Sequence, residues 1–172
     1  HAQYTTPGTG QAYDLNDLVD LSGGVFTVTA DTSFLQQGDF TLAAADTLLI
    51  TTNATWAVAA TAMINIAGRL EVAPPERLDL IAAVEDAHHQ GIRIEESASI
   101  HIENAHILQG GGIKCLTADL VIIHSTVAEQ KCIETTGGAL EVSRGKPIID
   151  HVEFRDNERA AWPGYDYLMQ AE

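Results

Sequence analysis

The sequence is poor in basic residues, aromatic residues and cysteine. Of 172 residues only nine are Lys or Arg, against 24 Asp or Glu, so the formal net charge is −15. Such a surface repels phosphate backbones and anionic lipid headgroups, which argues against nucleic acid as a partner. Aromatic residues make up 6% of the chain and provide few stacking platforms for a sugar-cleaving groove. Cations, neutral glycans and other proteins remain as partners.

Long apolar runs are also lacking. The longest uncharged run, residues 47–68, is interrupted by Thr and Asn, and its apolar residues alternate in short groups. A membrane helix is more continuously apolar, so we expect no membrane insertion. The chain starts at His1 without an initiator Met. We interpret this start as a mature terminus left by removal of a signal peptide, which predicts a secreted or cell-surface protein; an arbitrary chain boundary is the alternative.

A six-residue frame recurs: Ile, any residue, Asn or His, a small residue, any residue, then an apolar residue. Its copies are residues 102–107, 122–127 and 149–154. An offset of about 20 places Ile102 on Ile122, Ile100 on Leu120 and Ile107 on Val127. We place an insertion in the following unit around residues 144–147. Apolar alternation of period two on either side of the frame predicts short half-buried strands.

Short strands that recur at this interval, without helical spacing between them, predict an all-β fold: a right-handed parallel β-helix, a solenoid whose turns contact only their neighbours. A β-sandwich is the alternative, but it does not require residues 20 apart to repeat in register. We assign residues 46–157 to the coil and residues 1–45 to an N-terminal cap. The cap includes a short helix that starts after Asp14, its N-cap, and ends near Gly23.

The C-terminal segment, residues 158–172, is ambiguous. It begins like another turn, but residues 162–165 divert it, and residues 167–169 are suited to cover the last turn as an aromatic plug. It is therefore either a cap or the truncated start of a further turn.

Six segments carry a family resemblance, in this order: YTTPGTG, DLNDLVDLSGG, ADTLLI, GIRIEESASIHIENAHI, LQGGGIKC and GGALEVSRGKPIIDHVEFRDNERAA. In these the chain resembles secreted right-handed β-helix proteins of Gram-negative bacteria that use the type IX export pathway. The resemblance implies export, and adhesion or glycan contact as the function. Because such proteins continue through more turns and end in a sorting domain, it also implies that this chain is part of a longer coil.

The bend position of the repeated frame is occupied by Asn104, His124 and His151. Asn and His tolerate the left-handed backbone that such bends need, so we predict a structural ladder of stacked polar side chains. A metal site is the alternative for the two His, but no third ligand of suitable type occupies the same position. We interpret His88 and His89, in a loop before Gly91, as part of a solvated face.

A candidate ligand face contains five outward residues. They are Arg93, Glu95, His101, Glu103 and Lys114. Arg93, Lys114 and Lys131 are the basic residues that could neutralise a uronate. Residues 110–112 are three glycines without a following Lys-Ser/Thr, so we interpret them as a sharp corner and not a phosphate loop.

We expect neither a catalytic site nor a cofactor. Paired carboxylates for glycoside hydrolysis need a set separation across a cleft, which the sequence does not reveal, so a polysaccharide-active lyase or hydrolase stays the alternative. Acidic stretches near the N-terminus suggest Ca²⁺, but specific calcium-loop patterns are missing. Cys115 and Cys132 are placed about three positions apart on neighbouring turns, which favours buried free thiols over a disulfide. The sequence thus predicts a non-catalytic exported module that contacts a glycan or a surface protein.

Overall fold

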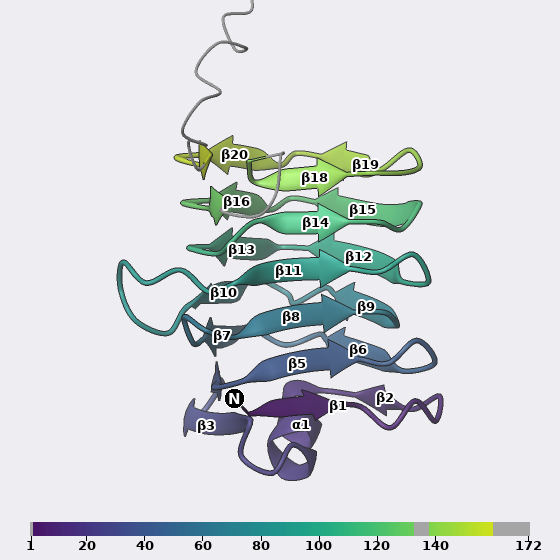
Figure 1. Ribbon diagram of the computed structural model, residues 1–172, viewed down its shortest axis with the longest axis vertical. Coiled ribbons are helices and arrows are strands. Elements are labelled where there is room, and N and C mark those ends of the chain that lie inside the picture. Colours follow the sequence, from purple (N-terminus) through teal and green to yellow (C-terminus); the bar gives the residue numbers. More distant parts are fainter. Residues whose placement is uncertain (1, 133–137, 160–172) are drawn as a thin grey trace, which may run out of the picture.

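The computed structural model describes residues 2–132 and 138–159, and these form a parallel β-solenoid (Figure 1). Apart from one antiparallel pair, the strands pair in parallel with strands one turn earlier and one turn later. The parallel β-helix expected from the repeat is confirmed, and the β-sandwich alternative is excluded. The hand of the coil stays a prediction.

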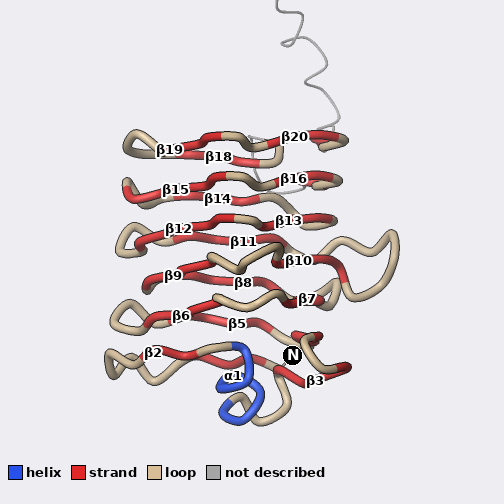
Figure 2. The backbone as a smooth tube through the Cα atoms, turned by 180° about the vertical axis from the view of Figure 1, so that it is seen from behind, coloured by secondary structure: helices blue, strands red, loops and turns tan. Residues whose placement is uncertain are grey.

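Three sheets run along the coil (Figure 2). The first contains β1 (Gln3–Thr5), β5 (Asp39–Leu42), β8 (Met63–Ile66), β11 (Gly91–Ile94), β14 (Ile113–Cys115) and β18 (Leu140–Val142). The second contains β2 (Ala12–Tyr13), β6 (Thr47–Ile50), β9 (Arg69–Val72), β12 (Ser99–Glu103), β15 (Asp119–Ile123) and β19 (Ile148–Asp150). The third contains β3 (Phe26–Ala30), β4 (Ser33–Gln36), β7 (Ala54–Val58), β10 (Leu78–Ala82), β13 (Ala105–Leu108), β16 (Thr126–Ala128) and β20 (Glu153–Arg155). β17 (Lys131–Cys132) and β21 (Glu158–Arg159) form a separate pair.

The core fills the inside of the coil, because alternate residues of each strand point inward. In β7, for example, Ala54, Trp56 and Val58 are buried while the residues between them are half-buried. Parallel pairing places equivalent residues of successive turns above one another. Aliphatic residues therefore meet at the roughly 4.8 Å spacing of paired strands. Near the N-terminal end, Phe26 and Phe40 pack edge to face around Trp56, with ring centroids 5.2 to 6.1 Å apart.

The predicted register is confirmed where the frame repeats. β15 aligns Leu120 and Ile122 with Ile100 and Ile102, and β16 aligns Val127 with Ile107. In the next turn Ile149 lies on Ile122.

The prediction of an insertion at residues 144–147 was wrong. Ile113 pairs with Leu140 and Val121 pairs with Ile148, so the segment of residues 140–148 is as long as its counterpart one turn earlier, residues 113–121. The additional residues lie before Leu140, in a stretch whose residues 133–137 are outside the described part. Residues 144–147 resemble a loop in composition, but composition does not determine loop length.

The expected N-terminal helix is confirmed as α1 (Leu15–Leu21). The Asp14 carboxylate accepts a hydrogen bond from the Asp17 backbone N–H at 2.9 Å, and the Asp17 side chain accepts one from the Asp14 N–H at 2.8 Å. This reciprocal capping box satisfies two N–H groups that the helix itself cannot. α1 lies at the N-terminal end of the coil (Figure 1). Because β1, β2 and β5 already stack in the sheets, the division at residue 45 stays an interpretation.

At the other end, the last described turn exposes apolar residues. They are Ile148, Ile149 and Phe154, which are 57%, 40% and 43% exposed. Residues 160–172, and with them the proposed aromatic plug, lie outside the described part of the chain. No helix among the described residues is long and apolar enough to cross a membrane.

Truncation of a core side chain is expected to cost different amounts of stability in different turns of the coil, even at equivalent positions. Ile122→Ala should lower the free energy of unfolding by about 2–5 kcal/mol, since Ile122 is fully buried. Ile149→Ala, one turn later at a half-exposed position, should cost less than half as much. Urea melts of the two variants measure the difference, and equal losses would contradict this register of burial.

Candidate functional site

A hollow of about 170 Å³ lies where β8, β11 and β14 begin, and we call it the flank pocket. Strands of three successive turns and two loops supply its walls. It is lined by Met63, His88, His89, Gln90, Ile92, Arg93, Gly111, Gly112, Lys114 and Lys131.

One wall is the loop of residues 83–90, which joins β10 to β11 and projects from the coil (Figure 1). Backbone hydrogen bonds hold its end to both neighbouring turns, from Gln90 N to Ala62 O at 3.0 Å and from His89 N to Gln109 O at 3.2 Å. The His88 Nε2 also donates to the carbonyl oxygen of Glu129, at 3.0 Å. The loop therefore has a defined position over the flank pocket.

A second wall is the glycine turn, residues 110–112, and the close approach of the loop explains its composition. A Cβ on Gly111 would collide with the carbonyl oxygen of Gln90, and one on Gly110 would lie 2.6 Å from the His89 ring. Gly91 adopts a φ of +105°, which side chains other than glycine rarely allow. The sharp corner expected from the three glycines is present, and it is also the surface on which the loop packs.

His89 is buried, and its placement on a solvated face was wrong. It is 1% exposed, and its Nδ1 accepts a hydrogen bond from the Gly91 N–H at 3.1 Å, so the neutral ring carries its proton on Nε2. That Nε2 has no hydrogen-bond partner among the described residues. Burial, and secondarily the neighbouring His88, lowers the pKa of His89 to about 4. The ring is therefore a neutral wedge between the loop and the glycine turn.

Three cationic side chains line the flank pocket. Arg93 and Lys114 are register neighbours on β11 and β14, and Lys131 comes from β17. The Arg93 Nε donates to the Glu95 carboxylate at 2.6 Å, and this hydrogen bond raises the pKa of the guanidinium. Lys114 lies 3.9 Å from a carboxylate oxygen of Glu141, at the limit of an ion pair. These are the three basic residues selected from the sequence, and the fold brings them together.

A second hollow, of about 250 Å³, adjoins the flank pocket and is mainly acidic; we call it the acidic hollow. It shares His88 and Lys131 with the flank pocket. Its other lining residues are Asp86, Gln109, Glu129, Gln130, Asp156 and Glu158.

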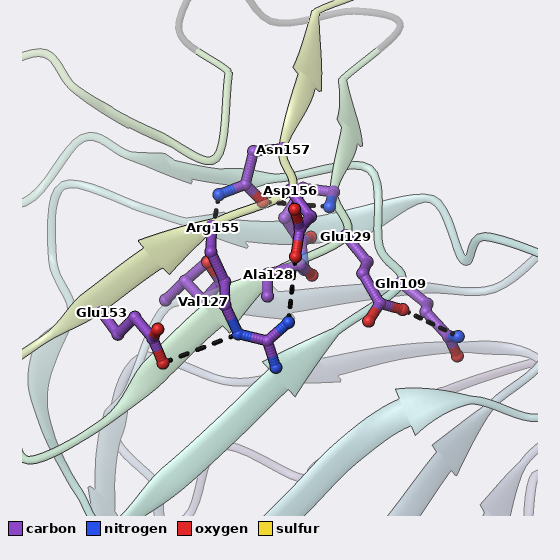
Figure 3. Close-up of polar contacts among 9 residues, drawn as sticks. Gln109, Val127, Ala128, Glu129, Glu153, Arg155, Asp156 and Asn157 are labelled. Carbon is purple, nitrogen blue, oxygen red and sulfur yellow. Dashed lines mark hydrogen bonds and ion pairs between the residues drawn. The ribbon is translucent and has the colours of Figure 1, made fainter.

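Part of the acidic hollow is a column of corner residues with left-handed backbone (Figure 3). Gln109, Glu129 and Asp156 have φ values of 57°, 55° and 53°. The Gln109 amide donates to the Glu129 carboxylate at 3.1 Å, and Arg155 binds Asp156 at 3.0 Å. The sequence interpretation missed this column, although a polar residue two positions after each frame signals it.

The left-handed backbone expected at the frame bend is confirmed. Asn104, His124 and His151 have φ values of 55°, 46° and 51°. The Asn104 amide donates to the carbonyl oxygen of Pro74 at 3.0 Å, and the two imidazole rings lie 5.3 Å apart. These contacts fit the structural ladder, which stays a hypothesis.

The five residues of the candidate ligand face divide between two sheets. Arg93, Glu95 and Lys114 lie together beside the first sheet, whereas His101 and Glu103 belong to β12 of the second. The His101 Nδ1 lies 2.6 Å from a Glu71 carboxylate oxygen, and this hydrogen bond lowers the pKa of Glu71. Glu103 lies 3.4 Å from the His124 ring. The sequence could not separate the two groups, since all five point outward.

Cys115 is a buried free thiol, and burial raises its pKa. Its register partner one turn later is Val142. The side chain of Cys132 lies outside the described part. Within that part, no group of three or more His, Cys, Asp or Glu is arranged to hold a metal ion.

Comparisons of the chain with family models, with curated proteins and with solved structures find no match.

Proposed function

We propose that the chain is a non-catalytic module of a secreted or cell-surface β-solenoid, and that it binds glycans through the flank pocket. The observation that carries the proposal is a hollow of about 170 Å³ with three cationic donors around it. A water molecule occupies about 10–15 Å³ of such space, so the hollow has room for a small ring. Met63 and Ile92 add apolar surface, which suits the amphipathic faces of a sugar.

The walls of the flank pocket are held before any ligand arrives. Arg93 and Lys114 stand on paired strands, and the loop of residues 83–90 is fixed to the turns on both sides. A preorganised site loses less conformational entropy on binding, which matters for sugars because each contact is weak.

Export is supported by the sequence rather than by the pocket. The order of motifs resembles β-helix cargo of the type IX pathway, and a net charge of −15 keeps an exported protein soluble. An adhesive role follows if the module presents the flank pocket outside the cell.

Among the described residues, none of those that line the flank pocket is acidic, and this supports a binding role. General acid and base groups are needed for glycoside hydrolysis, and carboxylates supply them in most such enzymes. A polysaccharide-active enzyme remains the second candidate because the acidic hollow, with Glu129 and Asp156, lies next to the cations.

A glycan array probed with the chain tests the proposal, with two tryptophan variants as the comparison. Met63→Trp fills the flank pocket and should weaken binding of the retained glycan at least about tenfold. Leu49→Trp, at a half-buried outward position of β6 in the second sheet, should leave binding unchanged. Retention of no glycan by the unmodified chain, or equal binding by the Met63 variant, would overturn the proposal. Shortened oligosaccharides in the eluate would support the enzyme instead.

A further inference from the structure

We infer that the flank pocket selects a single acidic sugar residue, one ring with a carboxylate or sulfate group and with uncharged neighbours in the glycan. The inference rests on the proposed glycan-binding function and adds the chemical class of the ligand. It is carried by the juxtaposition of a cationic pocket and an acidic hollow on one flank of the coil.

Positive charge is concentrated in the flank pocket. The chain has nine Lys and Arg among 172 residues, and three of the nine line this one hollow. Among the described residues no carboxylate lines the hollow with them, although Arg93 and Lys114 each pair with a carboxylate outside its lining. On a protein with a net charge of −15, such a local excess of cations attracts an anion at short range although the whole molecule repels it at long range.

The three cationic side chains of the flank pocket retain hydrogen-bond donors for a ligand. Arg93 is bound to Glu95 through Nε, and a guanidinium has four further N–H donors on its two terminal nitrogens. Lys114 is only loosely paired, at 3.9 Å. Lys131 is exposed, and its ammonium makes no ion pair within the described residues. Carboxylates and sulfates, with several acceptor oxygens, suit such a set of donors.

The flank pocket offers an uncharged sugar few favourable contacts. The described residues of its lining include no Trp, Tyr or Phe, so they offer a neutral ring no broad aromatic face on which to stack. Charge-assisted hydrogen bonds are roughly twice as strong as neutral ones. The acidic group of the ligand therefore provides most of the affinity.

The acidic hollow limits the ligand to one acidic sugar residue. A glycan that extends from the flank pocket toward the acidic hollow, past His88 and Lys131, meets Glu129 and Asp156. Both carboxylates belong to the corner column (Figure 3), and Asp86 and Glu158 add two more acidic residues to the lining, against Lys131 and the Arg155 partner of Asp156. A second negative charge on the next sugar would be repelled there. A lone acidic residue, at a chain end or between neutral sugars, avoids this repulsion.

NMR titration of the whole chain with matched small glycosides tests the inference. The probes are methyl glucuronide, methyl glucoside and methyl glucoside 6-sulfate, followed by a glucuronate–glucose disaccharide and a uronate-only disaccharide. Methyl glucuronide should bind at least about tenfold more tightly than methyl glucoside, because one charge-assisted hydrogen bond is worth about that factor. Lys131→Gln should weaken the glucuronide about tenfold, and Lys146→Gln, at an exposed lysine elsewhere, should not.

The outcomes separate the inference from the function on which it rests. Equal affinity for glucuronide and glucoside would overturn the acidic ligand but leave glycan binding intact. Tighter binding of the uronate-only disaccharide than of the mixed one would overturn the single-residue limit. Binding of the sulfate as well as the glucuronide supports an anionic sugar in general, whereas the glucuronide alone assigns a carboxylate. No binding of any probe, together with an empty glycan array, would overturn the proposed function itself.

Discussion

Replacing Asp46 by alanine is expected to lower the free energy of unfolding by about 4–6 kcal/mol. The Asp46 carboxylate is buried and accepts three backbone hydrogen bonds from the N-terminal loop, from Gly8 at 2.8 Å, Gly10 at 2.8 Å and Gln11 at 3.1 Å. Hydrogen bonds to a charged group contribute about 1.5–3 kcal/mol each, and the variant leaves all three donors without this acceptor. Denaturant melts measure the loss, and Asp20→Ala, at an exposed carboxylate of α1, is the matched control.

The same carboxylate gives the stability a pH dependence of known sign. Burial raises the pKa of Asp46, but the hydrogen bonds from the Thr6 side chain and the three N–H groups outweigh it, so the pKa lies below its ordinary value. The stabilisation is therefore fully present above pH about 4 and disappears as the pH falls through the folded-state pKa. In Asp46→Ala this part of the acid sensitivity should vanish; unchanged acid sensitivity, or a loss as small as that of Asp20→Ala, would contradict the role of the carboxylate.

Trp56→Ala is expected to cost about 4–6 kcal/mol. Trp56 is 1% exposed and packs against Phe26 and Phe40, so its removal opens a cavity worth about 3–5 kcal/mol. The indole Nε1 also donates to the Gln36 side chain at 3.1 Å. Gln36 is itself fully buried, and its amide oxygen loses this donor, which adds at least about 1 kcal/mol.

Two further variants divide the Trp56 effect into its parts. Trp56→Phe keeps an aromatic ring but removes the donor, so it should cost roughly half as much or less. Phe154→Ala, in the same column but 43% exposed, should cost least. Equal losses for Phe154→Ala and Trp56→Ala in urea melts would show that burial does not set the cost of truncation along this column.

The architecture was predictable from the sequence because inward residues must be apolar in every turn. Ile102 and Ile122 repeat at a fixed offset, and the side-chain period of two fixes which face each neighbour takes. The bend residue Asn104 was predictable for a different reason, since few side chains tolerate a positive φ. Loop length has no such constraint, and the insertion was therefore misplaced.

The candidate site was only partly predictable. Arg93 and Lys114 were selected as outward basic residues of a candidate ligand face, and the structure shows that they occupy paired positions in consecutive turns. The burial of His89 was not recognised, because it depends on a glycine turn about 20 residues later, and glycines leave no side-chain pattern to read. The acidic hollow was missed because its residues belong to corners, where hydrophobic periodicity gives no information.

The loop of residues 83–90 can change without a change in the strands that form the scaffold. The strands on either side of it, β10 and β11, keep their pairing with the preceding and following turns. Lengthening such a loop costs little free energy, since closure entropy grows only slowly with length. Changes in this loop can therefore alter the ligand contacts of the proposed glycan site while the scaffold and its cations stay fixed, which makes this corner of the coil a natural place for engineering the specificity of that site.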